Sequence, residues 1–204
     1  YNGASLTHYR DLGDWALRLE VYGGAESSRK NKLQALFSDV STDVRWSGIR
    51  GVLAEASNDW FTGRVSYSQS DYSNRLPGER EDLPLPAGGT RGPQSFLGFA
   101  ALADWNAWQF RGEYGRVKRE RGPGYAATIY LATLGHQWGK FTLTGGISRY
   151  RDTFNYGTIS VTATRSLALR YEIHTGAAVK LQADKFNDHT QPPLGGNAKV
   201  LTCL

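Results

Sequence analysis

The sequence predicts an all-β fold, an antiparallel β-barrel whose strands cross a membrane, and three observations support this prediction. Apolar and polar residues alternate with a period of two, in segment after segment of about ten residues. Very short turns join these segments in pairs, and longer polar stretches separate one pair from the next. The 11 Tyr and 6 Trp among 204 residues favour strands over helices.

Each strand pair is expected at a turn built from Asn, Asp or Gly, residues that tolerate the positive φ angles of tight hairpins. The five predicted turns lie at residues 11–14, 57–59, 104–107, 139–140 and 174–176. An aromatic residue stands within or just after four of them: Trp15, Trp60, Trp108 and Phe141. Aromatic residues at the hairpin bases are typical of a girdle at a membrane–water interface, which is the role we predict for these four.

The second strand of each pair shows the clearest alternation. It runs through residues 15–22, 60–70, 108–119, 166–173 and 179–184. The polar face of these segments carries charges of both signs, and we expect these side chains to line a pore: Arg18, Glu20, Arg64, Arg111, Glu113, Arg170, Glu172, Lys180 and Asp184. A solvated strand face, or internal salt bridges that fill a narrow barrel, would show the same pattern. Residues 49–55 and 125–137 fit either register, so their facing stays open.

Long polar stretches fall at the opposite ends of the strands, chiefly residues 25–42 and 72–94. Short turns at one end and long loops at the other are typical of bacterial outer-membrane barrels. We count about eleven strands on this pattern, the last over residues 198–204, and expect residues 1–204 to form a single β-barrel domain.

Composition and motifs exclude several other classes. No run approaches the roughly 18 apolar residues of a membrane-spanning helix. The net charge of +5 is dispersed along the chain, so we expect no nucleic-acid partner. One Cys and four separated His predict no disulfide framework and no metal site. Hydrolase and nucleotide-binding motifs are missing, so we expect no cofactor and no enzyme.

Two stretches carry a resemblance to a known family. Residues 3–15 look like a mid-barrel hairpin of the general porins of Gram-negative bacteria, in the branch known as hypothetical porins. The run Arg170-Tyr171-Glu172, then Ala177 to Phe186, resembles the penultimate hairpin of that family. The resemblance implies an outer-membrane channel for passive diffusion of small hydrophilic solutes or ions. It also implies contact with the lipid bilayer and lipopolysaccharide, and a homotrimer.

The chain departs from that family in two ways. Porins usually form about sixteen strands, and they usually end in an aromatic residue, whereas this sequence ends Cys203-Leu204. We therefore expect the C-terminal portion of a longer porin. The resemblance also suggests that the loop with Glu79, Glu81 and Asp82 narrows the barrel, although an ordinary exposed loop fits better, because the constriction loops of that family usually come earlier in the barrel.

Two alternatives stay open. A soluble all-β binding module would turn its apolar faces inward. An outer-membrane enzyme or adhesin would have a filled lumen with one clustered polar site near the long loops. Asp188 and His189, close to Asp184, are the residues that an acid–histidine enzyme would use.

Overall fold

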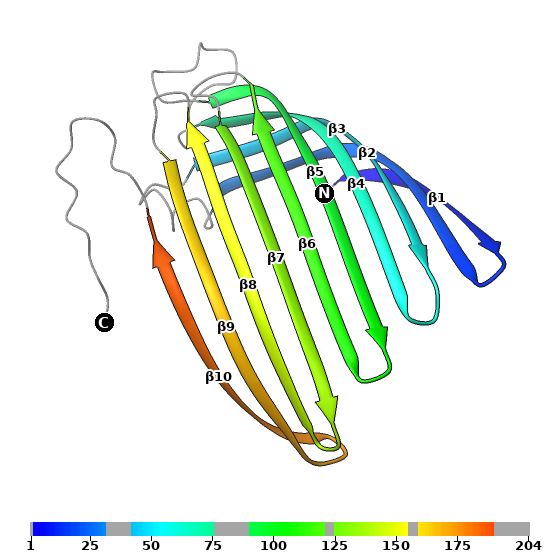
Figure 1. Ribbon diagram of the computed structural model, residues 1–204. Coiled ribbons are helices and arrows are strands. Elements are labelled where there is room, and N and C mark those ends of the chain that lie inside the picture. Colours follow the sequence, from blue (N-terminus) through cyan, green and yellow to red (C-terminus); the bar gives the residue numbers. More distant parts are fainter. Residues whose placement is uncertain (1, 32–41, 76–89, 121–124, 155–158, 190–204) are drawn as a thin grey trace.

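Ten antiparallel strands form one sheet in the computed structural model, which describes residues 2–31, 42–75, 90–120, 125–154 and 159–189. The strands follow one another across the sheet in chain order, each paired with its sequence neighbours (Figure 1). They are β1 (Asn2–Leu12), β2 (Trp15–Asn31), β3 (Thr42–Ser57), β4 (Phe61–Arg75), β5 (Thr90–Trp105), β6 (Trp108–Arg119), β7 (Tyr125–Trp138), β8 (Phe141–Phe154), β9 (Ile159–His174) and β10 (Ala177–Asp188).

The five predicted short turns are confirmed, all at one end of the sheet (Figure 1). Gly13, Asn106, Gly139 and Gly176 have positive φ angles in four of them. The turn between β3 and β4 uses a side chain instead, because Asn58 Oδ1 accepts hydrogen bonds from the backbone N–H groups of Trp60 (3.2 Å) and Phe61 (2.7 Å). An Asn side chain that caps a turn in this way replaces the positive φ angle.

The predicted strand count is corrected by the structure. The described residues hold ten strands rather than eleven, and the predicted eleventh, residues 198–204, lies outside them. The sheet is open, because β1 and β10 form its two edges and do not pair with each other. A closed barrel of about sixteen strands is therefore not what the described residues form.

The strands are longer than the sequence pattern predicted at the end away from the turns. β2 continues to Asn31, β4 to Arg75, and β5 begins at Thr90, so residues predicted as loop extend the ladder. Pro93 fits there because its carbonyl accepts a hydrogen bond from Glu120 N (3.2 Å), while its missing N–H removes only one bond of the ladder. Polar side chains at these strand ends hid the ladder from a pattern that depends on apolar alternation.

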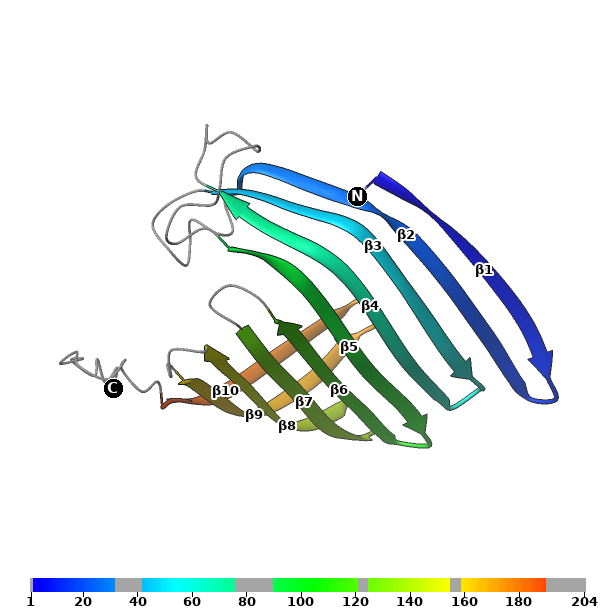
Figure 2. The ribbon, with the colours of Figure 1, turned by 90° about the horizontal axis from the view of Figure 1, so that it is seen from above.

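The sheet curves into a trough with a convex and a concave face (Figure 2). It is a single layer, so the few buried side chains among the described residues do not form a core between layers. Val44, Tyr72, Ala127 and Asp152 are the buried ones, each in the half of its strand farthest from the turns. No helix among the described residues is long and apolar enough to cross a membrane.

Candidate functional site

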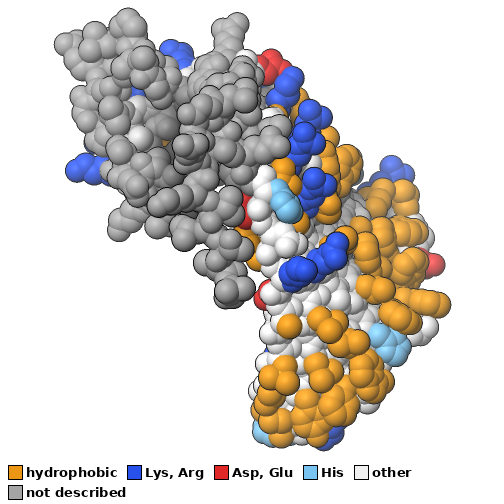
Figure 3. All heavy atoms as spheres, turned by 60° about the vertical axis from the view of Figure 1, so that its left-hand side comes forward, with side chains coloured by type: hydrophobic (Ala, Val, Ile, Leu, Met, Phe, Trp, Pro, Cys, Tyr) orange, Lys and Arg blue, Asp and Glu red, His pale blue; other side chains and the backbone are white. Residues whose placement is uncertain are grey.

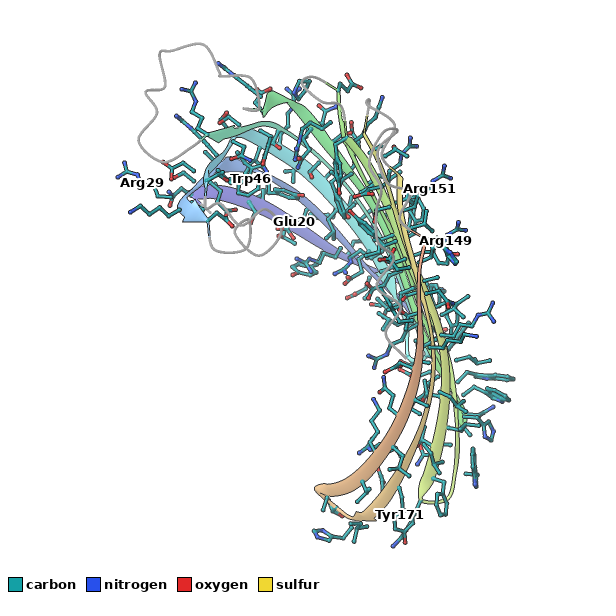
Figure 4. The ribbon with its side chains drawn as sticks, turned by 90° about the vertical axis from the view of Figure 1, so that its left-hand side faces the viewer. Glu20, Arg29, Trp46, Arg149, Arg151 and Tyr171 are labelled. Carbon is teal, nitrogen blue, oxygen red and sulfur yellow. The ribbon has the colours of Figure 1, made fainter. Side chains whose placement is uncertain are left out.

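The cross-strand register assigns every strand residue to one of the two faces. Residues paired across neighbouring strands point to the same side, and successive residues alternate. The rung Leu6, Val21, Val52, Tyr67 and Leu97 runs across the convex face from β1 to β5. Figure 4 shows Glu20 and Trp46 on the concave side of the sheet and Arg149 and Arg151 on the opposite side.

The convex face is apolar over the half of the sheet nearest the turns. Its large side chains are well exposed, up to 73% for Leu6 and 69% for Leu181. In β7 the apolar run from Trp138 to Tyr130 covers about nine residues, close to the roughly nine to eleven that a tilted strand needs to cross a bilayer. Soluble proteins rarely expose an apolar surface of this extent, and Figure 3 shows hydrophobic side chains gathered over this part of the sheet.

Aromatic rings gather on this face beside the short turns. Trp15, Trp108 and Phe141 are exposed there, and Trp60 lies in the turn before β4, 49% exposed. The rings of Phe141 and Tyr171 have centroids 4.8 Å apart, and those of Trp108 and His136 are 4.4 Å apart. Trp15, Trp108 and Phe141 therefore point away from the concave face, and none of the four residues predicted for the girdle is buried in a packed core.

The concave face carries all nine charged residues that the sequence placed on one polar face: Arg18, Glu20, Arg64, Arg111, Glu113, Arg170, Glu172, Lys180 and Asp184. Arg18 forms an ion pair with Glu20, and Arg170 with Glu172 at 3.1 Å. Within the described residues Arg111 and Glu113 are exposed without an ion pair, so these charges do not all neutralise one another.

Glu55 is a charged residue of this face that sequence reasoning missed. It lies in β3 directly between Arg18 of β2 and Arg64 of β4, so charges alternate along one rung across three strands. Glu55 falls in residues 49–55, whose facing the pattern could not settle. Counting back from Ser57 at the short turn would have placed it on the concave face.

The register also settles the facing of residues 125–137. Tyr125, Ala127, Ile129, Leu131 and Thr133 point to the concave face. Ile129 and Leu131 are exposed there, 52% and 37%, and Ile129 and the ring of Phe96 both lie next to Gly115. The concave face is therefore mostly polar but contains an apolar region on β5 and β7.

A second polar group lies on the concave face, farther from the turns, and was not predicted. The Tyr125 and Tyr150 hydroxyls are 2.7 Å apart, and Tyr150 donates to Asp152 Oδ2 at 3.0 Å. The other carboxylate oxygen of Asp152 accepts from the backbone N–H of Ser160 at 3.0 Å. We call Tyr125, Tyr150 and Asp152 the tyrosine–aspartate network; no local motif signals all of it, because Tyr125 comes from β7 and the other two from β8.

Arg119 lies beside this network and joins it to aromatic residues of β3 and β4. Its guanidinium carbon is 3.6 Å from the centre of the Tyr72 ring and 5.6 Å from that of Tyr125. It also donates to Gln94 Oε1 at 2.8 Å. Trp46 packs against the Tyr72 ring that Arg119 contacts, and the two ring centroids are 5.7 Å apart.

Several predicted positions cannot be placed or stay unassigned. Glu79, Glu81 and Asp82 lie outside the described residues, so the constriction prediction has no structural counterpart here. Asp184 and Asp188 both belong to β10, and His189 follows it with its backbone N–H bonded to Val161 O at 2.8 Å. Among the described residues no three His, Cys, Asp or Glu side chains are grouped as a metal site would need.

An open antiparallel sheet with an exposed apolar face, aromatic rings by its short turns and a charged concave face is the wall of an outer-membrane-type β-barrel. The comparison with solved structures agrees at this level. The chain is similar to OmpTdeltaL8, a loop L8 deletion mutant of OmpT, an outer membrane protein of Vibrio cholerae, with a TM-score of 0.53 and 8% sequence identity. The match covers 90% of this chain and 57% of that one, so the chain spans little more than half of the similar structure.

The likeness concerns the fold alone, given the identity of 8%. No protein-family model and no curated protein matches the chain. The prediction that the chain is not an enzyme is corrected on this finding. The matched protein is described as an outer membrane protein and not as a channel, and one fold carries both channels and enzymes, so the fold does not support that exclusion.

Proposed function

We propose that this chain forms part of the wall of a barrel in the outer membrane of a Gram-negative bacterium, through which small hydrophilic solutes diffuse passively. The observation that carries the proposal is the division of one sheet into an apolar convex face and a concave face with charges of both signs. A membrane-spanning wall needs the first, because lipid offers no hydrogen bonds to polar side chains. A water-filled passage needs the second.

The charges on the concave face suggest a passage of weak selectivity. Arg18, Glu55 and Arg64 alternate in sign along one rung. Glu113 lies on the same rung, separated from Arg64 by Ala100. Alternating charges cancel at a distance, whereas a ring of one sign would exclude ions of the same sign. We therefore expect anions and cations to pass with similar ease.

The two edges of the sheet require further strands. The outer edges of β1 and β10 have no strand partner among the described residues. Unpaired backbone groups are not tolerated in lipid, so the complete barrel must pair both edges. We propose that the ten strands are one arc of a larger closed barrel.

Conductance across a planar bilayer tests the proposal on the full-length protein. We expect stepwise open-channel currents and a reversal potential that Arg64→Glu shifts toward cation selectivity, since Arg64 is exposed on the concave face. Lys118→Glu makes the same charge change on the convex face and should leave selectivity unchanged. A protein that folds in the bilayer without conducting would overturn the channel proposal.

A barrel enzyme is the second candidate, and the tyrosine–aspartate network favours it. The network is a clustered polar site at the ends of β7 and β8 away from the turns, and Asp152 is only 8% exposed. A carboxylate linked through a hydroxyl to a surface Tyr can move a proton during hydrolysis. Turnover of peptide or ester substrates by the purified protein, lost in Asp152→Asn while folding is retained, would favour this candidate; no turnover across such a panel would remove it.

A further inference from the structure

Five basic side chains gather on the convex face just beyond the apolar surface: Arg116 of β6, Arg149 and Arg151 of β8, Arg165 of β9 and Lys185 of β10. We call them the basic cluster. All five are exposed. Figure 3 shows Lys and Arg side chains in a row beside the apolar surface, and Figure 4 shows Arg149 and Arg151 pointing away from the concave face.

On the convex face of β6, β8, β9 and β10, an apolar residue is followed by a basic residue at the next convex position, two residues along the strand. On the convex face Tyr114 is followed by Arg116, Ile147 by Arg149, Leu167 by Arg165, and Ala183 by Lys185. Two residues along a strand span roughly 7 Å. In a bilayer whose hydrocarbon meets the apolar surface, the cationic groups would lie within the headgroup layer, which begins directly at the edge of the hydrocarbon.

The register brings the five side chains close together. Arg165 lies directly opposite Lys185. Arg116 and Arg151 are both paired with Thr128 of β7, which places them on one rung, roughly 10 Å apart from strand to strand. Arg149 follows Arg151 on the same face of β8.

The cluster has no neutralising partner within the part of the chain that the structure describes. None of the five side chains forms an ion pair there, and the convex face of the described β7 to β10 holds no acidic residue. The nearby pair Lys118–Glu120, at 3.0 Å, lies at the end of β6. Like charges directly opposite one another, as Arg165 and Lys185 are, destabilise a sheet, so a bound anion would stabilise this arrangement.

The remaining strands do not repeat this pattern. At the same margin β3 has Arg50, which hydrogen-bonds Gln69 Oε1 at 3.1 Å, and β4 continues with Asp71. Charges of both signs lie there, and the guanidinium of Arg50 has a hydrogen-bond partner. The group of cations without an ion pair is therefore confined to β6–β10 among the described strands.

We propose that the basic cluster binds the phosphate groups of lipopolysaccharide in the outer leaflet. This proposal rests on the outer-membrane placement proposed above. Long loops of such barrels face outside, and the cluster lies at that end of the strands. Arg guanidinium groups bind phosphate through two parallel hydrogen bonds, and a lipid with more than one phosphate can engage more than one rung of the cluster at once.

Binding of lipid A to the folded full-length protein in neutral detergent micelles, followed by native mass spectrometry, tests the proposal. In Arg149→Gln/Arg151→Gln we expect affinity for lipid A to fall roughly tenfold or more, because each lost contact is a charge-assisted hydrogen bond. Arg10→Gln/Lys140→Gln removes the same charge near the short turns and should leave the affinity unchanged. Circular dichroism confirms that both variants keep the strand content.

Two further probes identify the anion. Phosphatidylglycerol and inorganic phosphate are titrated into the same proteins. Selective loss of lipid A binding supports the proposal. Equal loss for phosphatidylglycerol, binding of inorganic phosphate alone at the same concentrations, or unchanged lipid A affinity overturns it.

Conductance of the same variants separates this proposal from the channel. The convex cluster lies outside the lumen, so the variant that loses lipid A should still conduct. A protein that binds lipid A through the cluster but carries no current would refute the channel and leave the lipid site standing.

Discussion

The guanidinium of Arg119 lies over the ring of Tyr72, with its central carbon 3.6 Å from the ring centre. The two residues come from β6 and β4, with β5 between them, and Gln94 of β5 accepts two hydrogen bonds from the same guanidinium. A charged group held by three strands fixes their relative positions on the concave face. This contact therefore stabilises the part of the wall farthest from the short turns.

Replacing Tyr72 should show how much this contact contributes. Tyr72→Leu removes the ring under Arg119 and against Trp46, and we expect the free energy of unfolding to fall by about 1–3 kcal/mol. Tyr72→Phe keeps the ring and should cost much less. Urea unfolding in phospholipid vesicles measures both, and equal losses in the two variants would contradict the role of the ring.

The hydroxyl of Tyr150 should contribute to the stability of the sheet. In Tyr150→Phe the Asp152 carboxylate loses one donor while it stays buried, and we expect a loss of about 1–3 kcal/mol in unfolding free energy. Tyr130→Phe makes the same change on the exposed convex face and serves as the control. If the two substitutions have the same effect, the network does not stabilise the sheet.

The two faces can be told apart by tryptophan fluorescence. A variant that keeps only Trp108, on the convex face, should be quenched by brominated lipid. A variant that keeps only Trp46, on the concave face, should be quenched by aqueous acrylamide instead. The reverse result would show that the apolar face does not meet lipid, in contradiction to the proposed placement.

Two neighbouring residues of β9, one on each face of the sheet, allow the free-energy cost of placing a charge in lipid to be measured. Leu169 is convex and pairs with Leu143 and Leu181, whereas Ala168 points to the concave face. We expect Leu169→Arg to lower the unfolding free energy in vesicles by about 2–4 kcal/mol, and Ala168→Arg to cost far less. Comparable losses at the two positions would argue against a lipid-facing convex surface.

The sequence predicted those parts of the fold that depend on local chemistry. Turns at Gly13, Asn58 and Gly139 were evident because residues of these types favour tight reversals. The facing of Arg18, Arg111 and Arg170 followed from strict alternation. The sequence pattern ended the strands too early where alternation was weak, as at Asn31 and Thr90.

Features that depend on register across several strands could not be predicted. The apolar residues Leu53, Ile129 and Leu131 point to the concave face, so alternation in β3 and β7 gave no preferred side. Arg119 and Tyr72 are far apart in the sequence and belong to two strands that do not pair with each other. Their contact therefore depends on the position of β5 between them. A single sequence does not contain that information in any local motif.

The single-layer construction has a consequence for how such a wall changes over time. Its side chains meet solvent, whether lipid or water, instead of a second layer of protein, so few positions demand a particular shape. Selection then acts on the polarity of alternate residues and tolerates most exchanges of size. Two chains that are only 8% identical can therefore share this fold, as the comparison with the Vibrio cholerae protein illustrates.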